Sequence, residues 1–367
     1  MKLSAGIVGL PNVGKSTLFN TITNSQVEAA NYPFATIEPN VGVVKVNDDR
    51  LNKLAALINP NKVTPALCYF TDIAGLVKGA SKGEGLGNQF LANIREVDAI
   101  CHVVRCFNDS SITHIMENVD PIRDCEIINT ELIIADLDSM DKRYSKISSK
   151  AKSGDKVAMF ELEIAKKIMN LLKSSNFIDK NIFNGKEMEI VKQYNLLTIK
   201  PILYIANIDE SDIGEPNNNQ HFINLKKYIG DKHKIIPLAI AMEYEISKLD
   251  DNEKKVFMED LKINKTGLDI LINSTYDLLG IQTFFTFGMD ETRAWSFIKG
   301  MSAQECAGLI HTDIERGFIR AEIMSCDDLI AYGNELKVKE NGKLRVEGKE
   351  YIVKDGDVCY FRFNVSK

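Results

Sequence analysis

Short apolar runs alternate with stretches of helical spacing along the first two thirds of the chain. The runs occupy residues 2–10, 66–71, 99–105, 199–206 and 234–241. Continuous apolar runs of this length predict buried parallel strands, and the segments between them, such as the one that begins at Ser16, predict helices. The pattern therefore predicts an α/β fold with a mainly parallel sheet, whose ligand lies at the carboxyl ends of the strands.

A different period begins near residue 129. Apolar residues recur four and three positions apart on both sides of a break at residues 153–155, at Ile133, Leu137, Met140, Tyr144, Ile147, Phe160, Ile164, Ile168 and Leu171. This spacing predicts two antiparallel helices packed as a coiled-coil hairpin. Two βα units need about 60 residues, whereas Asp72 and Asn207 are 135 positions apart. We therefore expect an insertion at residues 129–196.

From about residue 281 onward, short strands and turns dominate. Residues 283–287, 317–323 and 358–364 have strand composition, turn signals stand at Asn341-Gly342 and Asp355-Gly356, and residues 302–310 suit a helix. The pattern predicts a small sheet packed on one helix, as a separate domain in residues 281–367. It carries no evident catalytic constellation, which favours a role in binding or regulation.

The loop after the first strand gives the strongest chemical signal. Residues 9–17 read Gly-Leu-Pro-Asn-Val-Gly-Lys-Ser-Thr, a match to G-x-x-x-x-G-K-[ST] between a strand and a helix. In such a loop main-chain N–H groups surround the phosphates, the lysine reaches the β- and γ-phosphates, and the first hydroxyl ligates Mg²⁺. Residues 1–128 and 197–280 are therefore predicted to form a nucleotide-binding domain. In this loop the residues predicted to contact the nucleotide are Asn12, Val13, Gly14, Lys15, Ser16 and Thr17. Ser16 is also predicted to ligate Mg²⁺, and Lys15 to take part in catalysis.

Two further segments suit a magnesium-dependent triphosphatase. The second apolar run ends in Asp-x-x-Gly, so Asp72 is predicted to face Mg²⁺ through water and the Gly75 N–H to meet the γ-phosphate. Thr36 is predicted to ligate Mg²⁺ when the γ-phosphate is present, with an ordinary loop residue as the alternative. Residues 78–87 contain four glycines, which favours a second mobile switch.

The base is predicted from the segment after the strand at 199–206. GTP-selective proteins of this architecture carry N-K-x-D there, whereas this chain has Asn207, Ile208, Asp209 and Glu210. Losing a bidentate base contact costs about 1–3 kcal/mol, so the sequence favours ATP over GTP. A shifted pose in which Asp209 or Glu210 still binds guanine leaves dual specificity open, and the segment also suits a helix cap. The next strand leads to a loop whose main chain is predicted to touch adenine, at Ala239, Ile240 and Ala241.

Composition and charge narrow the class of protein. The net charge of −6 argues against a protein that binds nucleic acid over its whole surface, yet residues 141–175 hold nine Lys or Arg and four Asp or Glu. This basic arm suits an RNA backbone, and a solvated helix surface is an equal alternative. The seven cysteines include no C-x-x-C pair, which argues against a disulfide framework or a zinc site. No apolar run approaches the roughly 20 residues of a membrane span, and no signal-peptide pattern is present, so we expect a cytoplasmic protein.

With these motifs in place, the chain resembles the Obg-like ATPase family, the YchF subfamily of Obg-class P-loop NTPases. The resemblance covers essentially the whole length, through residues 9–17, 32–40, 72–80, 83–90, 207–210, 292–295 and 348–357. It implies a Ras-like G domain that prefers ATP, an inserted coiled coil, and a C-terminal TGS domain of ubiquitin-like β-grasp form. It also implies ribosome binding and a part in stress responses. We expect a monomer that contacts the ribosome or a ribosomal subunit, and RNA, through the coiled coil and the TGS domain.

The resemblance also bears on the mechanism. Small GTPases place a water-orienting Gln directly after the Asp-x-x-Gly glycine, and this chain has Leu76 there. Hydrolysis is therefore slow, or another group acts; His114 is the predicted catalytic residue, with a surface-loop histidine as the alternative. Asn12 matches the position that holds K⁺ in cation-dependent relatives, which predicts K⁺ stimulation. An ATPase whose product matters and a nucleotide-gated binding module both remain possible, and slow turnover favours the module.

Overall fold

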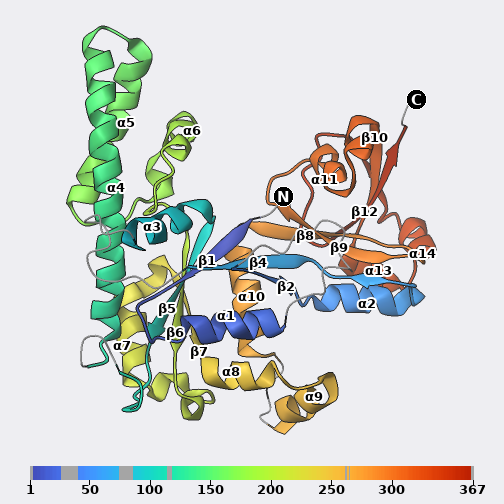
Figure 1. The fold of residues 1–367 in the computed structure, drawn as a ribbon. Coiled ribbons are helices and arrows are strands. Elements are labelled where there is room, and N and C mark those ends of the chain that lie inside the picture. The colour runs from blue at the N-terminus through green and yellow to red at the C-terminus, as the bar shows by residue number, and fades with distance from the viewer. Residues whose placement is uncertain are drawn as a thin grey trace.

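A computed structural model describes residues 3–25, 40–73, 86–113, 118–260, 263 and 265–364. It has three parts: an α/β body, a helical hairpin that projects from the body, and a C-terminal sheet with its own helices (Figure 1). In Figure 1 the hairpin and the C-terminal sheet lie on opposite sides of the body. Within the described ranges, no helix combines the length and the apolar character that a membrane crossing requires.

The body is built on a six-stranded sheet. Its order is β2 (Val41–Lys45), β4 (Leu67–Asp72), β1 (Ser4–Val8), β5 (Ala99–Arg105), β6 (Ile202–Asn207) and β7 (Lys234–Leu238). β2 runs antiparallel to β4 and every other neighbouring pair is parallel, so the predicted mainly parallel α/β fold is confirmed. The parallel register brings the carboxyl ends of β1, β4, β5 and β6 to one edge. The edge strand β2 is an addition to the strands that apolar runs predicted.

The helices of the body, except α9, share one continuous core with the sheet. They are α1 (Lys15–Asn24), α2 (Asp49–Ile58), α3 (Leu86–Glu96), α7 (Gln220–Ile229), α8 (Ile240–Ile246), α9 (Asp251–Asp260) and α10 (Gly267–Leu278). α1 packs against β2, β4 and α8, and α10 lies along β4 to β7. The core also includes Phe285, Ala294 and Val358 from the C-terminal part. The C-terminal sheet therefore shares its packing with the body.

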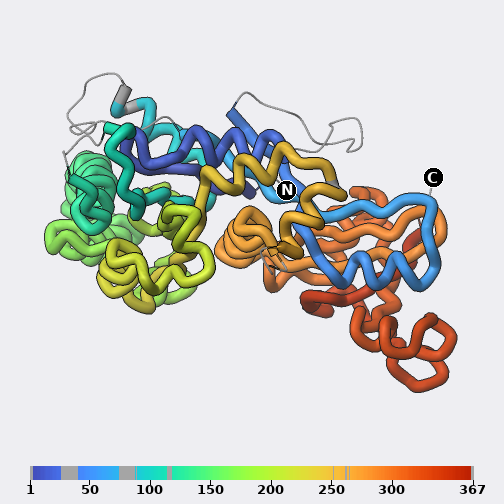
Figure 2. Tube along the Cα trace, turned by 90° about the horizontal axis from the view of Figure 1, so that it is seen from below, coloured from blue at the N-terminus to red at the C-terminus, as the bar shows by residue number. Residues whose placement is uncertain are grey.

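The hairpin consists of α4 (Pro121–Lys152) and α5 (Lys156–Lys173), followed by α6 (Gly185–Gln193). α4 begins where Asp120 accepts hydrogen bonds from two first-turn N–H groups and Pro121 occupies the first helical position. It continues unbroken through residues 128 and 129, so one helix carries the chain from the body into the hairpin. Figure 2 shows the two helices side by side, seen from below.

The core between the two helices differs in part from the predicted pattern. Ile133, Met140 and Ile147 of α4 are buried as the heptad spacing predicted. On α5 the prediction is wrong for Phe160, which is 44% exposed. The buried positions of that helix are Ala158, Ile164, Ala165, Ile168, Met169 and Leu172. Ile164 and Ile168 of the predicted face are fully buried, whereas Phe160 lies in the first turns of α5, next to the exposed Met159.

One carboxylate anchors the base of the hairpin. Asp136 of α4 is fully buried and accepts hydrogen bonds from the main-chain N–H groups of Leu197 and Thr198 at 3.0 and 2.8 Å. The Thr198 hydroxyl donates a third hydrogen bond at 2.8 Å. These bonds fix the point where the chain leaves the hairpin and returns to β6.

The C-terminal part is a second six-stranded sheet. Its order is β11 (Arg345–Glu347), β10 (Phe318–Ser325), β12 (Asp357–Phe363), β8 (Ile281–Thr286), β9 (Thr292–Ile298) and β3 (Val63–Thr64). The helices α11 (Ala303–Ile310), α12 (Thr312–Arg316), α13 (Cys326–Tyr332) and α14 (Glu335–Glu340) accompany it. The predicted strands and the helix near 302–310 are present, within one or two residues. β3 comes from the body and pairs in parallel with β9, which no local pattern predicted.

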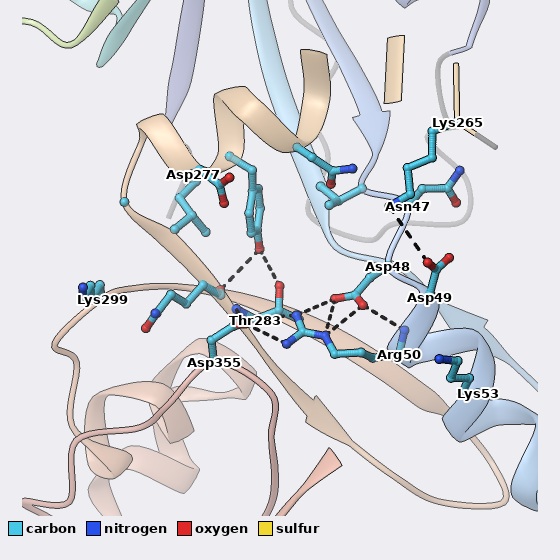
Figure 3. Close-up of a pocket in the computed structure, with 16 residues that line it drawn as sticks. Asn47, Asp48, Asp49, Arg50, Lys53, Lys265, Asp277, Thr283, Lys299 and Asp355 are labelled. Carbon is cyan, nitrogen blue, oxygen red and sulfur yellow. Dashed lines mark hydrogen bonds and ion pairs between the residues drawn. The ribbon is translucent and has the colours of Figure 1, made fainter. Parts of the chain in front are cut away.

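Arg50 of α2 joins the body to the C-terminal sheet (Figure 3). Its guanidinium contacts Asp48 at 2.8 Å and Asp355 at 2.7 Å, and it lies over the ring of Phe285. Asp355 also accepts a hydrogen bond from the Thr283 N–H at 2.9 Å. The contacts line a polar cavity of about 700 Å³ between the two parts. They fix how the C-terminal sheet sits on α2.

Candidate nucleotide-binding site

The loop between β1 and α1 has the backbone of an anion cradle. Asn12 and Gly14 have positive φ angles of 63° and 104°, which turn successive N–H groups toward one side. A Cβ atom on Gly14 would lie 2.6 Å from the side-chain nitrogen of Asn207, so only glycine fits between the loop and β6. α1 begins directly after this glycine and points its N-terminus at the same place, where its dipole favours negative charge.

Lys15 and Asp72 face each other across the ends of two neighbouring strands. The Lys15 ammonium is buried and donates a hydrogen bond to the Leu10 carbonyl at 2.7 Å. Burial lowers the pKa of Lys15 to about 8, and the negative charge of Asp72 opposes that shift. Burial likewise raises the pKa of the Asp72 carboxyl, and the charge of Lys15 opposes that change. The pair thus holds charge that is poorly solvated, as a site for a highly charged ligand requires.

The affinity for ATP is expected to fall above pH 8. Above that pH Lys15 is largely neutral in the nucleotide-free protein, because its pKa is about 8. Binding of a triphosphate therefore requires Lys15 to take up a proton. The dissociation constant should rise by about tenfold per pH unit. Calorimetry in two buffers of different ionisation enthalpy measures the proton uptake. The stability of the nucleotide-free protein changes with pH in the opposite direction. Between pH 8 and about pH 10.4 the lysine is protonated in the unfolded chain but largely neutral in the folded one, so the free energy of unfolding rises with pH.

The control for this pH dependence is Lys15→Arg, whose guanidinium stays charged throughout. Its dissociation constant should be nearly constant between pH 7 and pH 9.5. A wild-type dissociation constant that also stays constant over this range would contradict the assigned pKa.

The residues present suit a hydrated Mg²⁺ ion. Ser16 is exposed at the start of α1, and the half-buried carboxylate of Asp72 ends the neighbouring strand, so two hard oxygen donors flank Lys15. Of the other predicted loop contacts, Val13 is buried and Thr17 is half-buried. The predicted site residues Thr36, Gly75 and His114 lie outside the described residues, as do Leu76 and most of the segment 78–87.

Asn207 links the phosphate loop to the predicted base loop. Its side-chain N–H donates to the Val13 carbonyl at 2.9 Å, and its side-chain oxygen accepts from the Ile240 N–H at 3.2 Å. Asn207 itself is buried. The side chain therefore holds two loops of the site together, since both of its polar atoms already have protein partners.

The acidic pair after Asn207 divides into a cap and an exposed carboxylate. Asp209 caps a short 3₁₀ helix: its carboxylate accepts from the Ser211 N–H at 3.0 Å and from the Ser211 hydroxyl at 2.7 Å. These bonds hold the pKa of Asp209 below its usual range. Glu210 is exposed, and Ile208 is only 4% exposed. Glu210 is thus the carboxylate available to a base.

The loop at the end of β7 forms the other wall of the predicted base site. Ala239 precedes the first turn of α8, and both Ala239 and Ile240 are buried, while Ala241 is exposed. No side chain caps this helix start. Main-chain groups are therefore what this loop offers to a ligand, in line with the prediction for adenine.

Two buried polar residues beside the site were not predicted. His102 of β5 is the register partner of Val8, and burial together with the charge of Lys15 lowers its pKa to about 3. It is therefore neutral and packs on the ring of Tyr204. Arg105, at the end of the same strand, is 1% exposed. A charged residue inside an otherwise apolar strand, as in residues 99–105, was the available sequence signal.

Comparisons with known proteins give the same picture. A family model described as a 50S ribosome-binding GTPase matches residues 4–136, and the YchF-GTPase_C model, described as a protein of unknown function, matches residues 281–364. Over 366 residues the chain is 54% identical to the "Ribosome-binding ATPase YchF" of Bacillus subtilis strain 168 and 48% identical to that of Escherichia coli O157:H7, with 100% of both chains covered.

A solved structure extends the agreement to the whole fold. The structure of the Schizosaccharomyces pombe YchF GTPase matches with a TM-score of 0.89 at 38% sequence identity, covering 98% of each chain. The resemblance inferred from the motifs is thereby confirmed. With its phosphate loop, its hairpin and its C-terminal sheet all matched, the chain belongs to the YchF family of P-loop NTPases.

Proposed function

We propose that the protein is a ribosome-associated, magnesium-dependent ATPase that hydrolyses ATP slowly to ADP and phosphate and acts as a nucleotide-dependent switch in translation or stress response. The observation that carries this proposal is the buried Lys15 at the start of α1, which follows the phosphate loop, precedes Ser16 and interacts electrostatically with Asp72. The assignment to the ribosome rests on the relatives, which are named ribosome-binding ATPases.

Phosphate binding is assigned to the loop that starts α1. Main-chain N–H groups of residues 12–17 surround the α- and β-phosphates, and Lys15 reaches the β- and γ-phosphates. Ser16 and Thr36 would ligate Mg²⁺, Asp72 would hold one of its waters, and the Gly75 N–H would meet the γ-phosphate. When bound, the ion neutralises charge that develops on the phosphate oxygens.

Base selection is assigned to Glu210 and the loop at residues 239–241. The exposed carboxylate of Glu210 suits the exocyclic amino group of adenine, a hydrogen-bond donor. Asp209 is occupied as a cap, which supports Glu210 over Asp209. Asn207 and Ile208 act mainly by shaping the pocket, because both are buried.

Slow turnover follows from the residues assigned to catalysis. Leu76 cannot orient a water molecule, so we assign that role to His114, acting as a general base or as a positioning group. Asn12 is assigned as a K⁺ ligand, and the cation supplies positive charge between the phosphates. In this assignment hydrolysis resets a shape, and binding of the partner depends on which nucleotide is present.

The domain division proposed for this function is a nucleotide domain at 1–128 and 197–280, a coiled coil at 129–196 and a TGS domain at 281–367. The projecting hairpin and the C-terminal sheet are the proposed contacts with the ribosome or its subunits and with RNA. The net positive charge of residues 141–175 supports the hairpin in that role. We propose a cytoplasmic monomer.

Steady-state turnover of ATP and GTP, with and without ribosomes, tests the proposed function. We expect ATP to be preferred, the basal rate to lie below about 1 s⁻¹, and ribosomes and K⁺ to raise it. The control replaces K⁺ by Na⁺ at constant ionic strength. A fast basal rate that ribosomes leave unchanged would contradict a switch, and equal rates in Na⁺ and K⁺ would contradict the cation assignment.

The second candidate is a GTPase of the Obg class, or an enzyme that uses both nucleotides. The S. pombe relative, which is described as a GTPase, favours it. The same assay decides between the two, since a higher kcat/KM for GTP than for ATP would support the GTPase.

A further inference from the structure

Arg105 is a buried cation whose partners are main-chain carbonyls. It is 1% exposed at the carboxyl end of β5. Its Nε, Nη2 and Nη1 atoms donate to the carbonyls of Phe107, Asp109 and Ile112 at 3.2, 2.9 and 3.0 Å. Its guanidinium also lies 4.5 Å from the centroid of the Phe107 ring. Within the described ranges, the hydrogen bonds of its side chain all go to this one segment, residues 106–113.

The segment 106–113 connects the base side of the site to the phosphate side. At its start, the Cys106 N–H donates to the Asn207 carbonyl at 2.8 Å, and the Cys106 carbonyl accepts from the Asn219 side chain at 2.8 Å. At its end, the Thr113 carbonyl accepts a hydrogen bond from the Asn12 side chain at 3.1 Å. One end is therefore attached to the base motif and the other to the phosphate loop.

Without Arg105, little in the segment would hold this conformation. It contains no strand or helix, and its internal bonds are those of one turn, in which the Asp109 carboxylate accepts from the Ser111 N–H and hydroxyl. A planar guanidinium has five N–H donors in a fixed arrangement, so it can set the spacing of three carbonyls at once. Burying this charge is unfavourable for folding, which indicates a benefit other than stability.

We propose that Arg105 is a positioning residue that fixes the segment 106–113 so that the Thr113 carbonyl holds the Asn12 side chain in the phosphate loop. This inference rests on the proposed function, because Asn12 is the residue assigned to the monovalent cation. Arg105 acts through two other residues and touches neither nucleotide nor metal. Its loss misplaces Asn12 and slows turnover, while the main-chain phosphate contacts and the affinity for ATP persist.

The test compares Arg105→Met with the wild type in turnover, in ATP affinity and in amide exchange. We expect kcat to fall about tenfold, the dissociation constant for ATP to change less than about threefold, and K⁺ activation to weaken. Arg105→Lys keeps the charge but places its donors on a single nitrogen, which cannot reach all three carbonyls, and should give an intermediate kcat. If Arg105→Met does not fold, the loss of kcat in Arg105→Lys carries the test.

A double-mutant cycle with Asn12→Ala separates positioning from general destabilisation. If Arg105 acts through Asn12, the tenfold loss should largely disappear in the Asn12→Ala background. Equal losses of kcat in both backgrounds would overturn the proposal. The matched control is Arg95→Met: Arg95 also donates to a loop carbonyl, that of Asn195 at 2.8 Å, but at the base of the hairpin. It should lose stability without a loss of kcat.

Hydrogen exchange of the nucleotide-free protein makes the test independent of the proposed function. In Arg105→Met the amides of residues 106–113 and of the phosphate loop should exchange faster, whereas Arg95→Met should leave them unchanged. Unchanged exchange in Arg105→Met would refute the positioning role even if the wild type is an active ATPase. If exchange is faster in Arg105→Met but the wild type has no ATPase activity, only the assigned activity is refuted, and the positioning role of Arg105 stands.

Discussion

Replacing Lys15 with methionine is expected to weaken nucleotide binding strongly without destabilising the nucleotide-free protein. The ammonium is buried against the Leu10 carbonyl, and burial lowers its pKa to about 8. Burying this charge therefore costs the folded chain free energy, and an apolar side chain of similar length removes that cost. Turnover of ATP should fall on the order of 10²–10³-fold, because the lysine is the side chain that meets the β- and γ-phosphates.

Two measurements check this expectation: the dissociation constant for ATP and the urea midpoint of the nucleotide-free chain. Lys166→Met is the matched control, since Lys166 is exposed and its ion pair with Glu163 lies on the hairpin, away from the site. It should change neither quantity. Retention of ATP affinity within about threefold in Lys15→Met would show that this loop is not the phosphate site.

Changing the base motif toward N-K-x-D is expected to shift the preference from ATP toward GTP. In Glu210→Asp the shorter carboxylate withdraws from the position where it meets the adenine amino group. The second change, Ile208→Lys, supplies the aliphatic stem that lies across guanine. Together they should change the ratio of the two dissociation constants by about 10- to 100-fold. Competition binding with both nucleotides measures this ratio.

The arrangement of the motif determines the controls. Ile208 is almost completely buried, so a lysine there can destabilise the fold, and Glu210→Asp alone, at an exposed position, provides an arm that keeps the core intact. Asp209→Asn tests the neighbouring carboxylate, whose bonds to Ser211 make it a cap. It should alter stability more than nucleotide preference. An unchanged ratio in the double variant would contradict Glu210 as the base-selecting residue.

Local patterns were sufficient for five of the six strands of the body sheet, β2 excepted, and for the presence of the hairpin. Each of those five strands is a continuous apolar run, because helices cover the faces of a parallel sheet. Patterns failed where local spacing does not show which neighbours the fold supplies. Phe160 has the spacing of the buried Ile164 and Ile168, yet it lies in the first turns of α5 and is 44% exposed. β3 is only two residues long, and its pairing with β9 joins positions more than 200 residues apart.

The sequence by itself determined that the chain binds a nucleoside triphosphate and belongs to an Obg-like family. That information is local, because nine consecutive residues contain the glycines, the lysine and the hydroxyl that such a loop requires. Only the tertiary structure decided that Asn207 bridges two loops, that Asp209 is a cap and Glu210 the available carboxylate, and that Arg105 donates hydrogen bonds to the segment beside Asn12. These roles depend on which hydrogen-bond partners the fold brings together, several of them far apart in the chain, and no single stretch of sequence encodes such a partner.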